Sequence, residues 1–263
     1  MVNVHRLAAF TRDGDGGNEA GYCENIELND DEKQRIARMV NYSETAFVGP
    51  DLTMRYFTPK EEVDLCGHAT IAALHNAYAR GMIDAGVHTV KTKAGRVSAR
   101  ITHDAAFLRV PIQFISAVKG TFKDAIGVEP LDAYLVSAGV REIYLRVDDL
   151  SVITPDFDII ETLSHAWDVA GVYVYRILKP FAIHARNFLP AIGIDEESAT
   201  GTAAAGVSAM LRHRGLAPDT PFSVFQGEEL FKPSRIRIGA RDDAWRVEVG
   251  GSVRVIDTKT FSL

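Results

Sequence analysis

The 263-residue sequence lacks the motifs that mark many cofactor-dependent enzymes. No G-x-G-x-x-G follows a predicted strand and no G-x-x-x-x-G-K-[ST] is present, which argues against a dinucleotide or a nucleoside triphosphate as ligand. The eight histidines show no H-E-x-x-H or H-x-H spacing and there is no C-x-x-C, so no metal site is predicted. G-x-S-x-G is also missing, which argues against an α/β-hydrolase. We therefore expect neither a cofactor nor a metal.

Cysteines are few, long apolar runs are absent, and acidic residues outnumber basic ones. Two cysteines, Cys23 and Cys66, allow at most one disulfide, so a reduced, cytoplasmic protein is the simplest interpretation. There is no run of about 18 apolar residues and no apolar core of a signal peptide near the N-terminus, so we expect no membrane span. The formal net charge of −6 argues against nucleic acid as a partner, because phosphate binding requires a basic field.

The sequence does contain one internal repetition. Residues 67–81, GHATIAALHNAYARG, and residues 201–215, GTAAAGVSAMLRHRG, share both bounding glycines, an alanine and an arginine. They begin 134 residues apart (201 − 67), about half of the chain. Each is typical of a helix of small residues that opens at a glycine and leaves its first backbone N–H groups without partners. Two such helix starts predict a place for an anion such as a substrate carboxylate.

The elements around these two segments follow one scheme in both halves of the chain. In the first half we predict strands at 2–11, 45–48, 54–58, 87–92, 96–101 and 107–111, and helices at 28–41 and 67–80. In the second half we predict strands at 134–137, 142–147, 171–177, 183–188, 222–226, 234–238, 245–249 and 252–256, and helices at 155–167 and 201–214. The helices are too few for a doubly wound fold, so each small-residue helix is expected inside a curled sheet.

Two segments of the first half carry candidate catalytic groups. Glu44 stands in NYSETAFV, where partial burial is expected to raise the carboxyl pKa toward the range useful for acid–base catalysis. Cys66, Gly67 and His68 stand at a helix start, where a thiol has a lowered pKa and a histidine exchanges protons near pH 7. Each also has a structural interpretation: a solvated turn carboxylate, a packed thiol and a helix-capping histidine.

Two further segments are candidates for ligand binding. The acidic run 195–197 precedes the second small-residue helix, where it also suits the helix dipole. Thr200 and Thr202 offer hydroxyl groups to an anion at the same helix start. Asn18 follows Gly17 after the first predicted strand, a pair that is also typical of a plain turn.

Taken together, these segments resemble the phenazine-biosynthesis PhzF-like isomerases, relatives of diaminopimelate epimerase. The resemblance covers nearly the whole chain and is carried by Gly17-Asn18, Ser43-Glu44-Thr45-Ala46-Phe47-Val48, Leu65-Cys66-Gly67-His68-Ala69-Thr70, Arg186-Asn187-Phe188 with Pro190, Glu196 to Thr202, and Gln226-Gly227 with Pro233-Ser234. It implies an α+β fold of two similar domains related by internal duplication, each a curled, barrel-like, mainly antiparallel sheet around a central helix. We place the domains at residues 1–115 and 116–263, with a final strand that can return to the first domain.

The resemblance also implies residue roles, an active site between the domains and a homodimer. The catalytic residues of the family match Glu44, His68 and Glu197. The implied substrate-binding residues lie beside them: Asn18, Cys66, Gly67, Ala69, Thr70, Thr200, Gly201 and Thr202. Three residues depart from the family pattern: Glu197 replaces an aspartate, Ser198 replaces a proline in the same loop, and Glu19 replaces the proline after Gly-Asn. The longer side chain at 197 displaces a carboxylate by about 1 Å.

These observations lead to one hypothesis and two alternatives. The hypothesis is a cofactor-independent isomerase that moves a proton on a small carboxylate-bearing substrate, similar to trans-2,3-dihydro-3-hydroxyanthranilate isomerase. The first alternative is an amino-acid epimerase or racemase that pairs Glu44 with Cys66. A two-cysteine epimerase is disfavoured because Thr200 occupies the second cysteine position, and a hydroxyl is too weak an acid for that role. The second alternative is a non-catalytic protein of the same fold that binds small acids.

Overall fold

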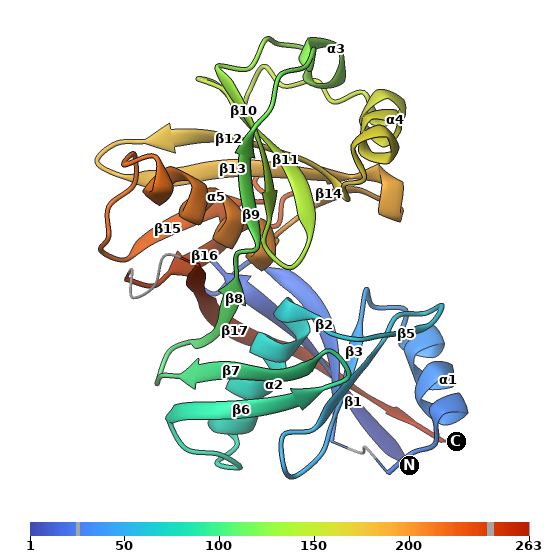
Figure 1. Ribbon diagram of the computed structural model, residues 1–263. Coiled ribbons are helices and arrows are strands. Elements are labelled where there is room, and N and C mark those ends of the chain that lie inside the picture. Colours follow the sequence, from blue (N-terminus) through green and yellow to red (C-terminus); the bar gives the residue numbers. More distant parts are fainter. Residues whose placement is uncertain (25–26, 241–244, 263) are drawn as a thin grey trace. The chain divides into compact units, whose positions relative to one another are not determined.

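The computed structural model describes residues 1–24, 27–240 and 245–262 (Figure 1). The chain forms two compact units: unit 1 comprises Met1–Arg109 and Gly250–Leu263, and unit 2 comprises Val110–Val249. Strands dominate both units, and in each a curled, mainly antiparallel sheet is built around one helix of small residues. The predicted α+β class with a repeated sheet-and-helix scheme is confirmed.

Unit 1 is a sheet around helix α2, which spans Gly67–Ala79. Its strands are β1 (Val2–Thr11), β2 (Asn18–Cys23), β3 (Thr45–Val48), β4 (Met54–Phe57), β5 (Glu62–Val63), β6 (Gly86–Thr92), β7 (Gly95–Ile101) and the unit 1 parts of β8 (Ala106–Pro111) and β17 (Arg246–Phe261). β1 pairs antiparallel with both β2 and β17, whereas β2 and β3 run parallel. α2 contacts β1, β2, β3 and β7 (Figure 1). The helix fits there because alanines occupy half of its buried positions, and small side chains allow the close approach of strands.

Unit 2 repeats this arrangement around helix α5, which spans Gly201–His213. Its strands are β9 (Phe114–Ala117), β10 (Asp132–Ser137), β11 (Arg141–Arg146), β12 (Gly171–Leu178), β13 (Ala182–Leu189), β14 (Ile194–Glu197), β15 (Phe222–Gln226) and β16 (Ser234–Ile238), with a single 3-10 turn, η1, at Pro190–Ile192. β11 with β12 and β13 with β15 run parallel, whereas β10 with β11, β12 with β13 and β15 with β16 run antiparallel. α5 contacts β10 and β16.

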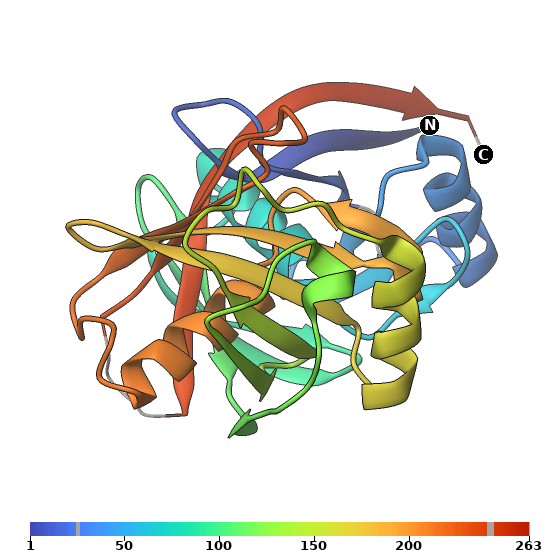
Figure 2. The ribbon, with the colours of Figure 1, turned by 90° about the horizontal axis from the view of Figure 1, so that it is seen from above.

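The remaining helices lie outside the two curled sheets. In unit 1, α1 (Asp30–Val40) contacts β4. In unit 2, α3 (Lys123–Ile126) and α4 (Phe157–Trp167) lie against each other, and α4 packs on β12 and β13 (Figure 2). A core that includes Ile143, Val172 and Phe188, all fully buried, fills the space under α4. These helices therefore cover sheet faces, whereas α2 and α5 lie within the sheets.

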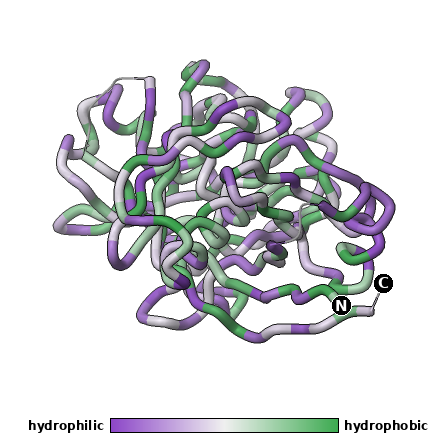
Figure 3. The backbone as a smooth tube through the Cα atoms, turned by 90° about the horizontal axis from the view of Figure 1, so that it is seen from below, coloured by the Kyte–Doolittle hydropathy of each residue, from purple (hydrophilic) through white to green (hydrophobic). Residues whose placement is uncertain are grey.

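Several predicted boundaries need correction. Residues 245–249 and 252–256 were expected as separate strands, but β17 runs unbroken through Gly250 and Gly251. A side chain at Gly250 would overlap the backbone oxygen of Ala106, so glycine here serves close strand packing rather than a turn. The expected turn at Asn18 is the first residue of β2. No helix among the described residues is long and apolar enough to cross a membrane. Hydrophobic and hydrophilic stretches alternate along the chain (Figure 3).

Candidate functional site

The N-termini of the two central helices differ from those of the surface helices. On α1 the Asn29 side chain accepts a hydrogen bond from the Glu32 N–H, and on α4 Asp156 accepts one from the Ile159 N–H. The N-cap residues of α2 and α5, Cys66 and Thr200, make no such bond, and neither helix has an acidic residue in its first turn. The N-cap side chains of these two helices thus leave the first N–H groups uncapped, and helix starts of this kind are suited to bind an anion.

Glu44 is held at the entry of β3 in unit 1. Its backbone oxygen accepts a hydrogen bond from the Gly21 N–H at 2.8 Å, and the neighbouring Ser43 hydroxyl donates to the Glu19 backbone oxygen at 3.1 Å. These bonds fix the segment beside β2. The Glu44 side chain, 22% exposed, reaches the start of α2, where its Oε2 lies 3.2 Å from Nε2 of His68.

The Glu44–His68 contact reverses the pKa shift that the sequence predicts. Burial alone raises the pKa of Glu44, but hydrogen bonding and charge attraction from His68 outweigh it and lower the pKa to about 2. Burial likewise works against the charged His68 ring, but the Cys66 sulfur and the Glu44 carboxylate raise the pKa of His68 well above its usual value. The pair is therefore a carboxylate beside an imidazolium at neutral pH, and the expected raised pKa of Glu44 is wrong.

Cys66 also differs from the sequence prediction. Its Sγ lies 3.4 Å from Nδ1 of His68, but the residue is only 7% exposed. Burial raises the pKa of the thiol, the Glu44 carboxylate raises it further, and His68 opposes both only in part. The expected low-pKa, reactive cysteine is therefore wrong, and Cys66 is a neutral packed thiol. It forms no disulfide.

The other predicted binding residues of unit 1 are mostly buried. Asn18 is 8% exposed and pairs with Ala9 across β1 and β2. Ala69 is 1% exposed. Thr70 is fully buried, and its hydroxyl is hydrogen-bonded to the Tyr56 hydroxyl at 2.7 Å and to the Cys66 backbone oxygen at 2.6 Å. These bonds tie the first turn of α2 to β4 and explain why a polar residue is present in the core.

In unit 2, Glu197 and Thr200 are joined at the start of α5. The Thr200 hydroxyl donates to Oε2 of Glu197. Gln226 braces the same loop, since its Nε2 donates to the Glu197 backbone oxygen at 2.7 Å and its Oε1 accepts from the Thr200 N–H at 3.3 Å. Asn187 donates to Thr200 Oγ1 at 3.0 Å. Gly201 and Thr202 follow as the first residues of α5 and are partly exposed.

The sequence interpretation assigned no role to three members of this loop network. Asn187 and Gln226 lie within stretches that carried the family resemblance, so their position was signalled although their contacts were not. Glu142, which accepts a hydrogen bond from Asn187 at 2.9 Å, is an ordinary residue of a predicted strand and gave no signal. Only the pairing of β11 and β13 on either side of β12 brings it near the loop.

Two of the three departures from the family pattern, Glu19 and Ser198, also have local consequences. The Glu19 carboxylate accepts a hydrogen bond from Nε of Arg6 at 2.9 Å, so this acidic residue is paired within unit 1. Ser198 is buried, and Gly227 packs against the Ser198 backbone. A side chain at position 227 would overlap the Ser198 backbone oxygen. The loop that lacks proline is thus restrained by packing.

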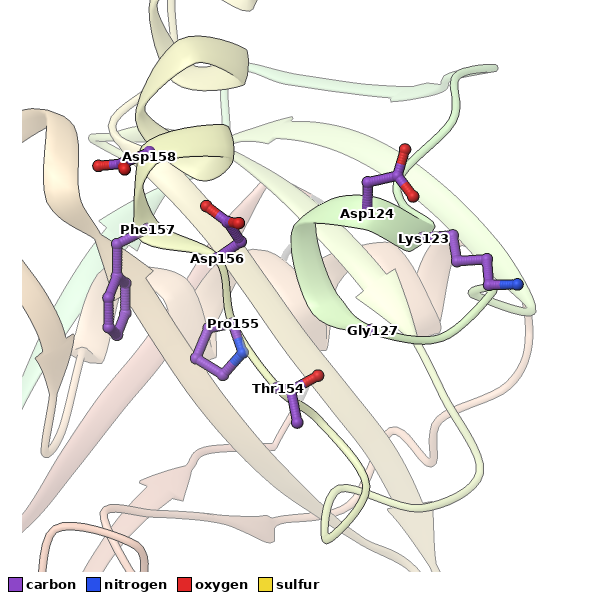
Figure 4. A pocket seen from close by; sticks show the side chains of 8 residues that line it. All are labelled: Lys123, Asp124, Gly127, Thr154, Pro155, Asp156, Phe157 and Asp158. Carbon is purple, nitrogen blue, oxygen red and sulfur yellow. The ribbon is translucent and has the colours of Figure 1, made fainter.

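A separate hollow lies beside α3 and α4 in unit 2 (Figure 4). It is lined by Lys123, Asp124, Gly127, Thr154, Pro155, Asp156, Phe157 and Asp158. None of these is a predicted site residue, and Asp156 is already engaged as the cap of α4. Three aspartates against one lysine disfavour a carboxylate ligand here.

The sequence is similar to one protein family and to curated isomerases over nearly its whole length. Residues 7–258 match the family described as phenazine biosynthesis-like protein. An uncharacterized isomerase of Clostridium acetobutylicum is 30% identical, covering 97% of this chain and 96% of that protein. The uncharacterized isomerase YfhB of Bacillus subtilis is also 30% identical, covering 98% and 95%.

Two solved structures show the same fold. The PhzF-family phenazine biosynthesis protein of Bacillus anthracis has a TM-score of 0.88 at 24% identity, covering 100% of this chain and 99% of that one. A probable proline racemase from Agrobacterium radiobacter, solved with bound carbonate, has a TM-score of 0.66 at 14% identity, covering 100% and 93%. At these identities the likeness concerns the fold alone.

Proposed function

We propose that this protein, which belongs to the phenazine biosynthesis-like family and is an isomerase of that family, moves a proton within a small carboxylate-bearing substrate. The reaction uses acid–base groups of the chain itself. Glu44 takes a proton from a carbon next to an unsaturated system and returns it to another carbon of the same molecule. The electron pair moves along the unsaturated system, so atoms and charge balance without an external oxidant or reductant.

The observation that carries the proposal is the Glu44–His68 pair. A carboxylate of pKa about 2 is a weak base toward carbon. A substrate oxygen or nitrogen that accepts a hydrogen bond from the imidazolium would replace Glu44 as the partner of that N–H group, and the pKa of Glu44 would then rise. Substrate binding thus makes Glu44 a stronger base, while the imidazolium stabilises negative charge on the substrate.

The starts of the two central helices support the same proposal. Backbone N–H groups at Gly67 and His68, and at Gly201 and Thr202, are suited to hold a carboxylate or the delocalised negative charge that follows proton removal. We assign Glu197 to positioning the substrate or assisting the transfer, in line with the family resemblance. Neither role requires a bound metal or organic cofactor.

We further propose trans-2,3-dihydro-3-hydroxyanthranilate as the first substrate to test, and a homodimer as the assembly, both from the family resemblance. The compound carries the required carboxylate and unsaturated ring. Proton NMR in heavy water follows its isomerisation directly, and analytical ultracentrifugation gives the assembly. Isomer formation supports the assignment, and an unchanged spectrum at high enzyme concentration contradicts this substrate.

The epimerase alternative receives less support from the structure. It requires Cys66 to act as an acid or base, whereas the thiol is buried and its pKa is raised. In unit 2 the corresponding hydroxyl of Thr200 is committed to Glu197. Loss of an α-proton signal from one amino-acid enantiomer with racemisation would favour this alternative over the proposed isomerase.

A further inference from the structure

A continuous chain of polar side chains runs through the interior of unit 2. It begins at Glu142 on β11, which is 1% exposed, and passes to Asn187 on β13, whose Nδ2 donates to Glu142 Oε1 at 2.9 Å. The same Nδ2 donates to Oγ1 of Thr200 at 3.0 Å, and the Thr200 hydroxyl donates to Glu197. Two carboxyl groups on different strands are thus linked by one amide and one hydroxyl.

The direction of these bonds follows from counting donors at Thr200. Its Oγ1 accepts from Nδ2 of Asn187 at 3.0 Å and from Nε2 of Gln226 at 3.2 Å. A hydroxyl oxygen has two lone pairs and one proton. Because both lone pairs are used, the proton is left for the carboxylate of Glu197. The hydrogen bond from the Thr200 hydroxyl to Glu197 therefore depends on Asn187 presenting its NH2 group, and not its oxygen, to Thr200.

Glu142 fixes that orientation while it is ionised. Its Oε1 accepts from Asn187, and its Oε2 accepts from the Tyr144 hydroxyl at 3.2 Å. Gly206 on α5 leaves the space that this hydroxyl occupies, since a side chain there would overlap it. The titratable groups that face Glu142 are Tyr144 on its own strand, Tyr173 on β12 and Glu197 on β14.

Protonation of Glu142 would reverse the direction of the hydrogen bonds at Asn187 and Thr200. Its new O–H needs an acceptor, and Oδ1 of Asn187 is buried without a hydrogen-bond partner among the described residues. Rotation of the amide by half a turn would bring Oδ1 to Glu142 and also to Thr200. The Thr200 hydroxyl would then donate to Asn187, and Glu197 would lose the hydrogen bond from Thr200.

We propose that Glu142 is a positioning residue: its charge state sets which way the Asn187 amide points and thereby where the Thr200 hydroxyl donates. Burial raises the pKa of Glu142 to about 7, and the nearby Glu197 carboxylate acts in the same direction, so the change falls near neutral pH. The inference rests on the proposed function only in so far as Glu197 takes part in the reaction. The switch itself is a property of the free protein.

The test is therefore an NMR titration without substrate, between about pH 5 and pH 9. With 15N-labelled asparagine and 13C-labelled glutamate, we expect the Asn187 side-chain amide and the Glu197 carboxyl carbon to shift together with one inflection near neutrality. Glu142→Gln, which keeps the shape but cannot ionise, should abolish both inflections. Thr200→Val should leave the Asn187 inflection and remove that of Glu197.

Two results would overturn the proposal. One is an Asn187 amide that does not shift over this range in the wild type. The other is a Glu197 signal that titrates identically in wild type and Glu142→Gln. Glu161→Gln, the same change on the exposed face of α4, is the matched control and should leave every inflection in place. Because no substrate enters the titration, failure of the isomerase assignment would not affect its outcome.

Discussion

His68 Nε2 lies 3.2 Å from Glu44 Oε2, and the two side chains are only 10% and 22% exposed. This pair joins the start of β3 to the start of α2 within unit 1. Each partner favours the charged form of the other against the cost of burial. The protein thus holds an ionised carboxylate and an imidazolium side by side, and on the proposed function the carboxylate becomes a stronger base when substrate takes its place beside the imidazolium.

The first prediction concerns the charge of His68. Its pKa is raised, so its contribution to stability is present below the usual histidine value and is lost as pH rises through the folded pKa. Glu44→Gln removes the carboxylate partner, and burial should then lower the His68 pKa. Imidazole NMR signals should show His68 protonated at pH 7 in the wild type, and its pKa should be lower in the variant. Identical titration of His68 in both proteins would contradict the ion pair.

The second prediction concerns Glu142 and the pH dependence of stability. Its pKa rises from 4.5 to about 7 on folding, so the folded state binds the proton more tightly. The unfolding free energy should fall as pH rises from about 4.5 through 7, by on the order of 3 kcal/mol. Glu142→Gln should flatten this part of the curve, measured by urea unfolding at several pH values. An equal fall in both proteins would exclude Glu142 as the group responsible.

The third prediction concerns the contact between α5 and β11. A side chain at Gly206 would overlap the Tyr144 hydroxyl, so Gly206→Ala should destabilise unit 2 by about 1–3 kcal/mol. Adding Tyr144→Phe removes the nearest atom and should recover part of the loss in a double-mutant cycle. Strictly additive effects in urea unfolding would show that the two residues do not interact.

The fourth prediction separates the proposed isomerase from the epimerase alternative. Cys23 and Cys66 are free and buried, at 1% and 7% exposure, so a thiol reagent should modify neither quickly in the native protein and both after unfolding. Cys66→Ala should retain proton transfer to within a few-fold. Rapid modification of Cys66 that abolishes activity would instead favour a cysteine-dependent epimerase.

The local sequence predicts the central helices and most strands because their signals are local. The small residues and bounding glycines of 67–81 and 201–215 marked α2 and α5 almost to the residue. The strands that were missed lack such signals. β14 consists of Ile194 and an acidic run that is typical of a loop, and it becomes a strand only by pairing with β13. β2 contains a glycine and no clear alternation.

The candidate site was predictable in identity but not in electrostatics. The sequence motifs around Glu44, His68 and Glu197 identify these residues as candidates. The pKa of Glu44, however, depends on which side chain faces it. A partner 24 residues away reversed the shift that burial alone would produce. The hydrogen-bond network of Glu142 cannot be predicted from the sequence, because three strands and a helix start must come together before its hydrogen bonds exist.

In the proposed reaction Glu44 is the base that moves the proton. The most direct test follows, by proton NMR in heavy water, the loss of the carbon-bound proton from trans-2,3-dihydro-3-hydroxyanthranilate. Wild type and the surface control Glu61→Gln should react alike, whereas Glu44→Gln should be slower by at least about 10²-fold while its thermal unfolding shows a folded protein. Glu44→Gln reacting at the wild-type rate would exclude Glu44 as the base.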